Sequence, residues 1–84
     1  MERVFGMDVH RDLLVTTVKT GEEEETRYSG VGIGDLENLI EWLREKKCYK
    51  GVMESSGIYW VPIYTVLTDN GFENWNELDG LDAF

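Results

Sequence analysis

Apolar and polar residues follow one another along this chain in a pattern that predicts mostly strands in its first third. Short apolar, β-branched runs at residues 3–9 and 12–19 predict two strands joined by a tight turn at residues 10–11. Residues 24–29 are polar and predict a third strand at a sheet edge, where charge discourages further strand pairing. Residues 50–54 contain another apolar run, Gly51-Val52-Met53, whose short length indicates a buried strand rather than a helix.

Apolar residues at helical spacing mark the segment between the third and fourth strands. Residues 35–47 are expected to form an amphipathic helix, with acidic residues early and Lys46 and Lys47 late, as the helix dipole favours. Trp42 on this helix is interpreted as a packing residue. The expected inner face comprises Leu36, Leu39, Ile40 and Leu43.

A second helix is expected at residues 58–70, after the fourth strand. Ser55 and Ser56 are interpreted as its cap. Pro62 fits its first turn, and Asn70-Gly71 marks its end. The apolar positions expected to face inward are Ile58, Val61, Tyr64 and either Val66 or Leu67. Together these elements predict an α/β fold, a mixed sheet with flanking helices.

The length and the charge of the chain narrow its possible functions. With 84 residues the chain is expected to be one small domain with a thin hydrophobic core. It carries 8 basic and 17 acidic residues, which give a net charge of −9. Because proteins bind nucleic acid mainly by neutralising phosphates with lysine and arginine, the chain alone is expected to bind DNA poorly.

The single cysteine and the hydropathy pattern bear on the compartment. Cys48 has no partner for an internal disulfide, which fits a reducing cytoplasm. No histidine lies near it in sequence, so a structural role is favoured over a catalytic one. The sequence has no apolar stretch long enough to span a bilayer and no signal-peptide pattern. The expectation is a cytoplasmic protein with no membrane partner.

The glycine-rich segment Gly30-Val31-Gly32-Ile33-Gly34 invites comparison with a phosphate-binding loop. The dinucleotide motif would place a glycine where Asp35 stands, and Asp35 and Glu37 would repel phosphate. The nucleotide-loop interpretation is therefore rejected.

Two acidic residues are the strongest candidates for chemistry. Asp8 closes the apolar run of the first strand, and Glu54 closes that of the fourth. In open α/β sheets ligands collect outside the carboxyl ends of the strands, so both carboxylates are expected at one cation site. Carboxylate oxygens suit Mg2+. A structural alternative stays open, with Asp8 as a turn-forming residue and Glu54 as a helix-entry acid.

Two motifs resemble those of a known family. The segments are Gly6-Met7-Asp8-Val9-His10-Arg11-Asp12 and Val52-Met53-Glu54-Ser55-Ser56-Gly57-Ile58-Tyr59-Trp60. They are similar to motifs in the N-terminal RuvC-like domain of the DEDD insertion-sequence transposases, a group that includes the Piv-type DNA invertases. The resemblance covers residues 3–73, with support from Trp42-Leu43, Tyr64, Leu67 and Gly71-Phe72.

The resemblance implies an RNase H-like fold in which four acids hold two divalent ions, Mg2+ or Mn2+, for cleavage and strand transfer of DNA. Asp8 and Glu54 match the first two acids and are expected to be catalytic and metal-binding. His10 and Arg11 occupy the family's His-Lys position beside the first acid, with a solvent-facing turn as the alternative. DNA is the partner in the intact family, a guide RNA is a further candidate partner, and a homo-oligomer is expected.

The C-terminal part departs from the family pattern. In the family an apolar strand follows the Gly-Phe pair, two further aspartates complete the acidic set, and a separate domain carries a serine nucleophile. None of these is recognisable here, because residues 74–84 are polar and acidic, with Phe72, Trp75 and Leu78 spaced in threes. These residues are expected to form a tail outside a partial RuvC-like domain of residues 1–73.

The resemblance therefore implies a truncated DNA transposase with half of its acidic set. Asp79 and Asp82 are interpreted as solvated tail acids, and metal binding by Asp8 and Glu54 in the isolated chain is expected to be weak or absent.

Three hypotheses for the function remain. The first is a metal-dependent transposase domain that is inactive alone. The second is a non-catalytic module that associates with itself or with a full-length transposase, and the third, ranked last, is a phosphotransferase of the actin-like ATPase class.

Overall fold

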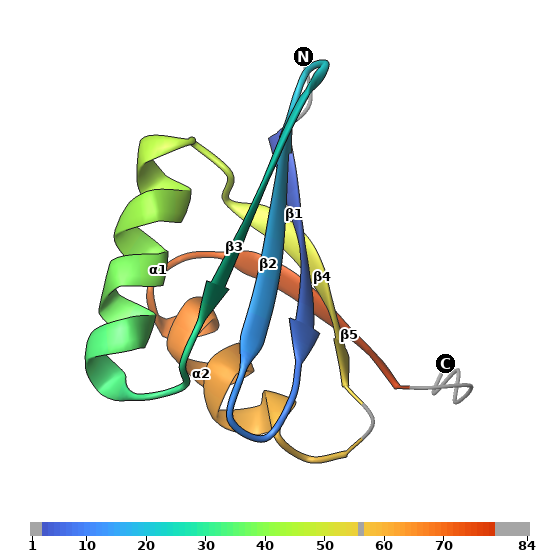
Figure 1. The fold of residues 1–84 in the computed structure, drawn as a ribbon, viewed down its shortest axis with the longest axis vertical. Helices are drawn as coiled ribbons and strands as arrows, with labels where there is room; N and C mark the ends of the chain where they lie inside the picture. Colours follow the sequence, from blue (N-terminus) through green and yellow to red (C-terminus); the bar gives the residue numbers. More distant parts are fainter. Residues whose placement is uncertain (1–2, 56, 79–84) are drawn as a thin grey trace.

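A five-stranded mixed sheet and two helices make up the fold of the computed structural model, which describes residues 3–55 and 57–78. The elements in chain order are β1 (Arg3–Val9), β2 (Leu14–Thr20), β3 (Glu23–Ser29), α1 (Ile33–Glu45), β4 (Lys50–Ser55), α2 (Trp60–Asp69) and β5 (Glu73–Leu78) (Figure 1). The strand order is β3-β2-β1-β4-β5. Neighbours from β1 to β3 pair antiparallel, and β4 pairs in parallel with both β1 and β5. The predicted α/β class is confirmed.

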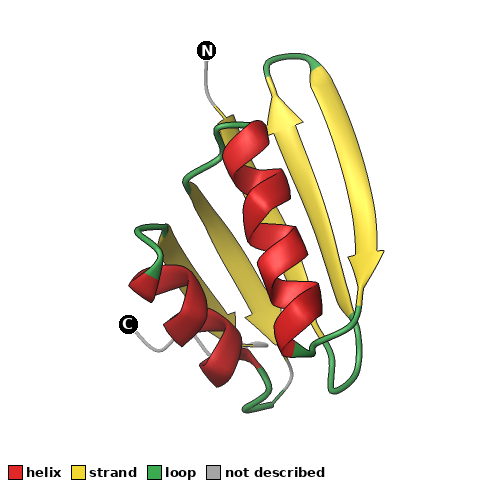
Figure 2. Ribbon diagram, turned by 90° about the vertical axis from the view of Figure 1, so that its left-hand side faces the viewer, coloured by secondary structure: helices red, strands yellow, loops and turns green. Residues whose placement is uncertain are grey.

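Both helices lie on the same face of the sheet (Figure 2). Each helix connects two strands that run in the same direction, and both connections step the same way across the sheet. Because such crossovers are almost always right-handed, both helices pack on one side. We call this side the covered face. The opposite side, which no helix of the described segments covers, is the open face.

Side-chain alternation in the strands separates the two faces. In β1, Phe5, Met7 and Val9 are buried beneath the helices. The residues between them therefore belong to the open face, because successive side chains in a strand point to opposite sides. The same alternation continues in β2 and β4, whose buried residues are Leu14, Thr16, Val18, Gly51, Met53 and Ser55.

The first helix confirms the predicted inner face. Trp42 and the four expected apolar residues are buried, and the Arg27 guanidinium lies 4.5 Å from the centre of the Trp42 ring. The helix begins two residues earlier than predicted, at Ile33. Asp35 helps to set this start, because its carboxylate accepts a hydrogen bond of 3.1 Å from the backbone N–H of Gly32.

An ion pair ties the end of this helix to the edge strand. The Lys46 ammonium lies 2.7 Å from the carboxylate of Glu25 in β3, and this hydrogen bond lowers the pKa of Glu25 below its ordinary value. Lys47 follows with a φ of 58°, the left-handed conformation that commonly ends a helix. The predicted helix end at Lys47 is therefore two residues too late.

The second helix corrects the predicted cap. Residue 56 lies outside the described residues, and α2 begins only at Trp60, after a Tyr59 cap that makes no side-chain hydrogen bond. The Ser55 hydroxyl instead bonds within the loop: it lies 3.2 Å from the carbonyl oxygen of Gly57 and 3.3 Å from its N–H. Serine capping by Ser55 is thus wrong, because the loop runs four residues beyond β4.

The inner face of α2 also differs from the prediction. Ile63 and Leu67, one turn apart, are its buried residues, whereas Ile58 and Val61 are exposed. Ile58 precedes the helix, so its spacing to later residues carries no helical meaning. The predicted end is confirmed, since Gly71 takes a φ of 89° just after α2. With 13 and 10 residues, neither described helix has the length and apolar character needed to cross a membrane.

The largest correction concerns the expected tail. Residues 74–78 belong to β5, which pairs in parallel with β4 along its whole length. Phe72 and Asn74 are buried and Trp75 is exposed, which is the period of two that the spacing in threes concealed. Strands pair through backbone N–H and C=O groups, which polar residues carry as well as apolar ones. A polar sequence can therefore extend the sheet here. The interpretation of residues 79–84, including Asp79 and Asp82, lies outside the described part of the chain.

Candidate functional site

The two acidic residues singled out in the sequence are neighbours in the structure. Asp8 and Glu54 each occupy the next-to-last position of their strand, β1 and β4, and they are Cα partners in the parallel pairing. Neighbouring strands lie about 4.8 Å apart, so the two backbones bring the acids side by side. The expected meeting of the two acids at one end of the sheet is therefore present.

Local sequence determines the direction of both side chains. Asp8 lies between buried Met7 and Val9, and Glu54 lies between Met53 and Ser55, which are also buried. The buried neighbours take the covered face, and the acids are left on the open face, where both are exposed. Burial of the flanking residues thus positions the pair.

A shallow hollow of about 240 Å3 lies on the open face beside the acids. Its centre is Gly6, which has Thr17 and Val52 as cross-strand neighbours. An added Cβ at Gly6 would meet no atom within 4 Å, so the missing side chain leaves the space open. The hollow is lined by Gly6, Met7, Asp8, Val15, Thr17, Val52 and Glu54.

A third acidic position falls in the same row of the sheet. In the pairing of β4 with β5, Glu77 is the Cα partner of Glu54. The backbone register therefore aligns Asp8, Glu54 and Glu77 across three neighbouring parallel strands. The sequence analysis missed Glu77 because it assigned β5 to the tail. The sequence offered no clear signal for this strand, because polar Asn74 is buried and apolar Trp75 is exposed.

The donor set fits a metal held partly by other ligands. Among the residues that the structure describes, no three His, Cys, Asp or Glu side chains gather around a common point. Among the described residues that line the hollow, Asp8 and Glu54 are the ones with carboxylate oxygens. Mg2+ is commonly bound by one or two carboxylates, with water and substrate phosphate completing its shell, so Asp8 and Glu54 are the residues that could hold it here.

The residues that follow Asp8 form an exposed turn. The backbone N–H of His10 donates a hydrogen bond of 2.9 Å to the carbonyl oxygen of Leu13, which closes the connection between β1 and β2. The Arg11 side chain donates to the Asp12 carboxylate at 3.1 Å, and both side chains are exposed. His10 and Arg11 thus occupy the solvent-facing turn that was the alternative to a role at the site.

Cys48 is buried and chemically unreactive. It is fully buried in the hydrophobic core, between the end of α1 and the start of β4, with its sulfur 3.8 Å from the carbonyl oxygen of Val4. Burial raises the pKa of the Cys48 thiol, so the reactive thiolate is disfavoured. The structural interpretation of this cysteine agrees with its position.

Neutralising one acid of the pair should stabilise the protein. Like charges on directly neighbouring strand positions cost about 0.2–1 kcal/mol, so Asp8→Asn is expected to raise the free energy of unfolding by that amount without metal. The gain should shrink at high salt, because ions screen exposed charges. Thermal or urea unfolding measures it, with Glu22→Gln in the β2–β3 turn as the control. Destabilisation by Asp8→Asn would show that its carboxylate has a structural role.

Comparison with protein-family models and with curated proteins finds no match to this chain.

Proposed function

We propose that this chain is the N-terminal part of the catalytic domain of a DNA transposase or recombinase, with a partial RNase H-like, RuvC-like fold. Asp8 and Glu54 bind Mg2+ or Mn2+ and serve phosphoryl transfer on DNA in the intact protein. The chain is inactive alone, because it contributes only part of the acidic set that the family uses.

One observation carries the proposal. Asp8 and Glu54 are partners on adjacent parallel strands, at the carboxyl ends and on the open face. A purely structural acid needs no such partner, and two like-charged carboxylates side by side lower stability modestly. The sheet also agrees with the general α/β class that the proposed fold requires.

The chain's own residues supply position and space at this site. The Asp8 and Glu54 carboxylates concentrate negative charge beside the hollow, which attracts a divalent cation. Gly6 leaves room for a substrate phosphate above the sheet. A divalent ion held there supplies a Lewis acid that stabilises charge on the oxygens of a phosphoryl displacement.

The net charge of −9 explains why the isolated domain should bind DNA poorly. A substrate phosphate next to Asp8 and Glu54 would be repelled without a cation. The remainder of an intact transposase would have to supply the basic residues that grip the DNA backbone. Metal binding is therefore the property of this chain that can be tested directly.

The test is a titration with Mg2+ and Mn2+, followed by calorimetry and NMR. We expect weak binding in the native chain, with Mn2+ broadening the backbone signals at the carboxyl ends of β1 and β4 first. Asp8→Asn and Glu54→Gln should each abolish the localised broadening, because each removes half of the donor pair.

The matched control for this titration is the double substitution Glu22→Gln and Glu23→Gln, which neutralises two exposed acids, one in the β2–β3 turn and one at the first position of β3. It should leave the localised broadening unchanged. Equal broadening along the whole acidic surface, insensitive to Asp8→Asn and Glu54→Gln, would contradict the proposal and indicate generic attraction of cations.

A second candidate function is a non-catalytic module that forms homo-oligomers or associates with a full-length transposase. The open face favours it, because exposed Tyr28 and Trp75 lie on the two edge strands and half-buried valines lie between them. This function predicts oligomers that form without metal. Sedimentation at several concentrations, with and without EDTA, distinguishes it from the metal-dependent function.

A further inference from the structure

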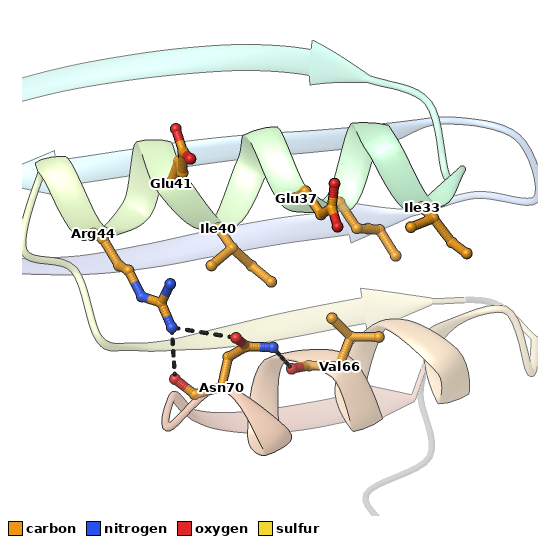
Figure 3. Close-up of a pocket in the computed structure, with 8 residues that line it drawn as sticks. Ile33, Glu37, Ile40, Glu41, Arg44, Val66 and Asn70 are labelled. Atoms are coloured by element: carbon orange, nitrogen blue, oxygen red, sulfur yellow. Dashed lines mark hydrogen bonds between the residues drawn. The ribbon is translucent and has the colours of Figure 1, made fainter.

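A groove runs between the two helices on the covered side of the protein (Figure 3). It has a volume of about 440 Å3 and lies on the opposite side of the sheet from Asp8 and Glu54. Ile33 of α1 and Val66 of α2 contribute apolar walls. The groove is lined by Ile33, Leu36, Glu37, Ile40, Glu41, Arg44, Val66 and Asn70.

One end of the groove is closed by a polar contact between the helices. The Arg44 guanidinium lies 3.2 Å from the side-chain oxygen of Asn70 and 3.4 Å from its carbonyl oxygen. The Asn70 amide in turn donates to the carbonyl oxygen of Val66 at 2.8 Å. Figure 3 shows Arg44 reaching across to Asn70, whereas Ile33 lies at the opposite end of the groove. The groove is therefore elongated along α1, from Ile33 to Arg44.

The length of the groove matches a helix better than a compact ligand. The lining residues of α1 run from Ile33 to Arg44, which at about 1.5 Å per residue corresponds to roughly 17 Å, or three helical turns. They recur at helical spacing, so they form one stripe along α1. A partner helix that lies in the groove would meet this stripe with apolar residues at the same spacing.

Ile33 is the clearest sign of an unfilled surface. Its side chain is 79% exposed, although isoleucine is among the residues most often buried. It occupies the first position of α1, where a polar residue would serve the helix equally well. Beside it, the floor of the groove is made by Leu36 and Ile40, which also belong to the hydrophobic core. A ligand that covers Ile33 would thus bury apolar surface next to the hydrophobic core.

The charges along the groove specify a basic partner. Glu37 and Glu41 are exposed and stand one turn apart on α1. Within the described part of the chain neither carboxylate forms a hydrogen bond or an ion pair. Arg44, the basic residue among the described lining residues, donates to Asn70 at one end of the groove, so the lining carries two acidic residues and one basic residue. An approaching helix therefore meets two unpaired negative charges beside an apolar floor.

We propose that this groove binds an amphipathic helix whose apolar stripe is flanked by lysine or arginine. Apolar side chains of the partner cover Ile33 and the floor, and its basic residues pair with Glu37 and Glu41. The binding is independent of metal and of the open face, so it stands apart from the proposed catalytic function.

The probe is a synthetic helical peptide of about 14 residues, which spans slightly more than three turns. It carries leucine at positions i, i+3, i+7 and i+10 with lysine on either side, and a second peptide carries glutamate in place of each lysine. Fluorescence anisotropy with the native chain should show binding of the lysine peptide and much weaker binding of the glutamate peptide. Equal affinity for the two peptides would overturn the charge argument.

Two substitution pairs separate the groove from generic attraction. Ile33→Ala should weaken the lysine peptide about tenfold, since it removes much of the apolar area that the partner buries. Ile58→Ala is its matched control, because Ile58 is 78% exposed and lies outside the groove; it should change little. An equal loss with both variants would overturn the proposal.

For charge, Glu37→Lys with Glu41→Lys should weaken the lysine peptide about tenfold and strengthen the glutamate peptide. The control, Glu22→Lys with Glu23→Lys, changes the net charge equally but lies in the β2–β3 region. If the control weakens binding as much, net charge alone explains the affinity and the proposal fails. Concentration-dependent dimers that Ile33→Ala disrupts would identify a second copy as the occupant and would likewise overturn it.

Discussion

Replacing Gly51 with alanine is expected to destabilise the fold by about 3 kcal/mol or more, at or beyond the upper end of ordinary overpacking. Gly51 is buried in β4 opposite Phe5 of β1, and an added Cβ would run into the backbone oxygen and the ring of Phe5. The oxygen belongs to the sheet backbone, so relief requires the two central strands to separate. Chemical denaturation measures the loss, and the melting temperature should fall by about 12 °C or more.

A second glycine, on the strand that contacts Gly51, provides the control. Gly6 is the residue after Phe5 in β1, but it faces the open side, where an added Cβ meets nothing within 4 Å. Gly6→Ala should therefore stabilise the protein by about 0.5–1 kcal/mol, because glycine within a strand costs conformational entropy. Similar effects of Gly51→Ala and Gly6→Ala on stability would contradict the close approach of β4 to Phe5.

The second large effect is expected at a fully buried leucine of α1. Leu43 is fully buried, and Leu43→Ala should cost about 3–4 kcal/mol through lost apolar burial and the cavity left behind. A small domain of this size has roughly 4–13 kcal/mol of total stability, so a large share would be lost. Urea unfolding followed by tryptophan fluorescence measures the change, since Trp42 is the neighbouring residue on α1 and is buried as well.

An exposed residue of the same helix separates burial from helix propensity. Ile33→Ala removes a similar side chain from the start of α1, where most of it is in water. It should change the stability by less than about 0.5 kcal/mol, as surface substitutions usually do. A comparable loss at Leu43 and Ile33 would mean that α1 does not pack on the sheet through Leu43.

The fold was predictable from sequence where one physical signal dominated. In β1 and α1 the apolar residues follow one clear period, and burial of Phe5, Met7, Leu39 and Leu43 confirms both faces. In α2 the signal was mixed, because Ile58 and Val61 are apolar but exposed. Composition alone does not reveal where a helix begins, and the missing cap at its start removed the usual marker.

β5 was not predictable, because its stability depends on a distant partner. Its sequence is polar and carries little strand propensity of its own, whereas the free edge of β4 offers a full row of backbone donors and acceptors. Such tertiary pairing overrides local composition. The placement of Asp8 beside Glu54 followed from the rule that ligands gather at strand ends, but the alignment of Glu77 required the register of β5.

The central position of β1 has a consequence for how the chain acquires its fold. Contacts between β1, β2 and β3 join residues close in sequence, whereas β1 meets β4 only after the whole of β3 and α1 has intervened. Non-local pairing is slow, because a long loop must close before any contact forms. During synthesis the three-stranded meander can therefore assemble first, with the second edge of β1 still unpaired. Arrival of β4 at this edge is the step on which completion of the sheet depends.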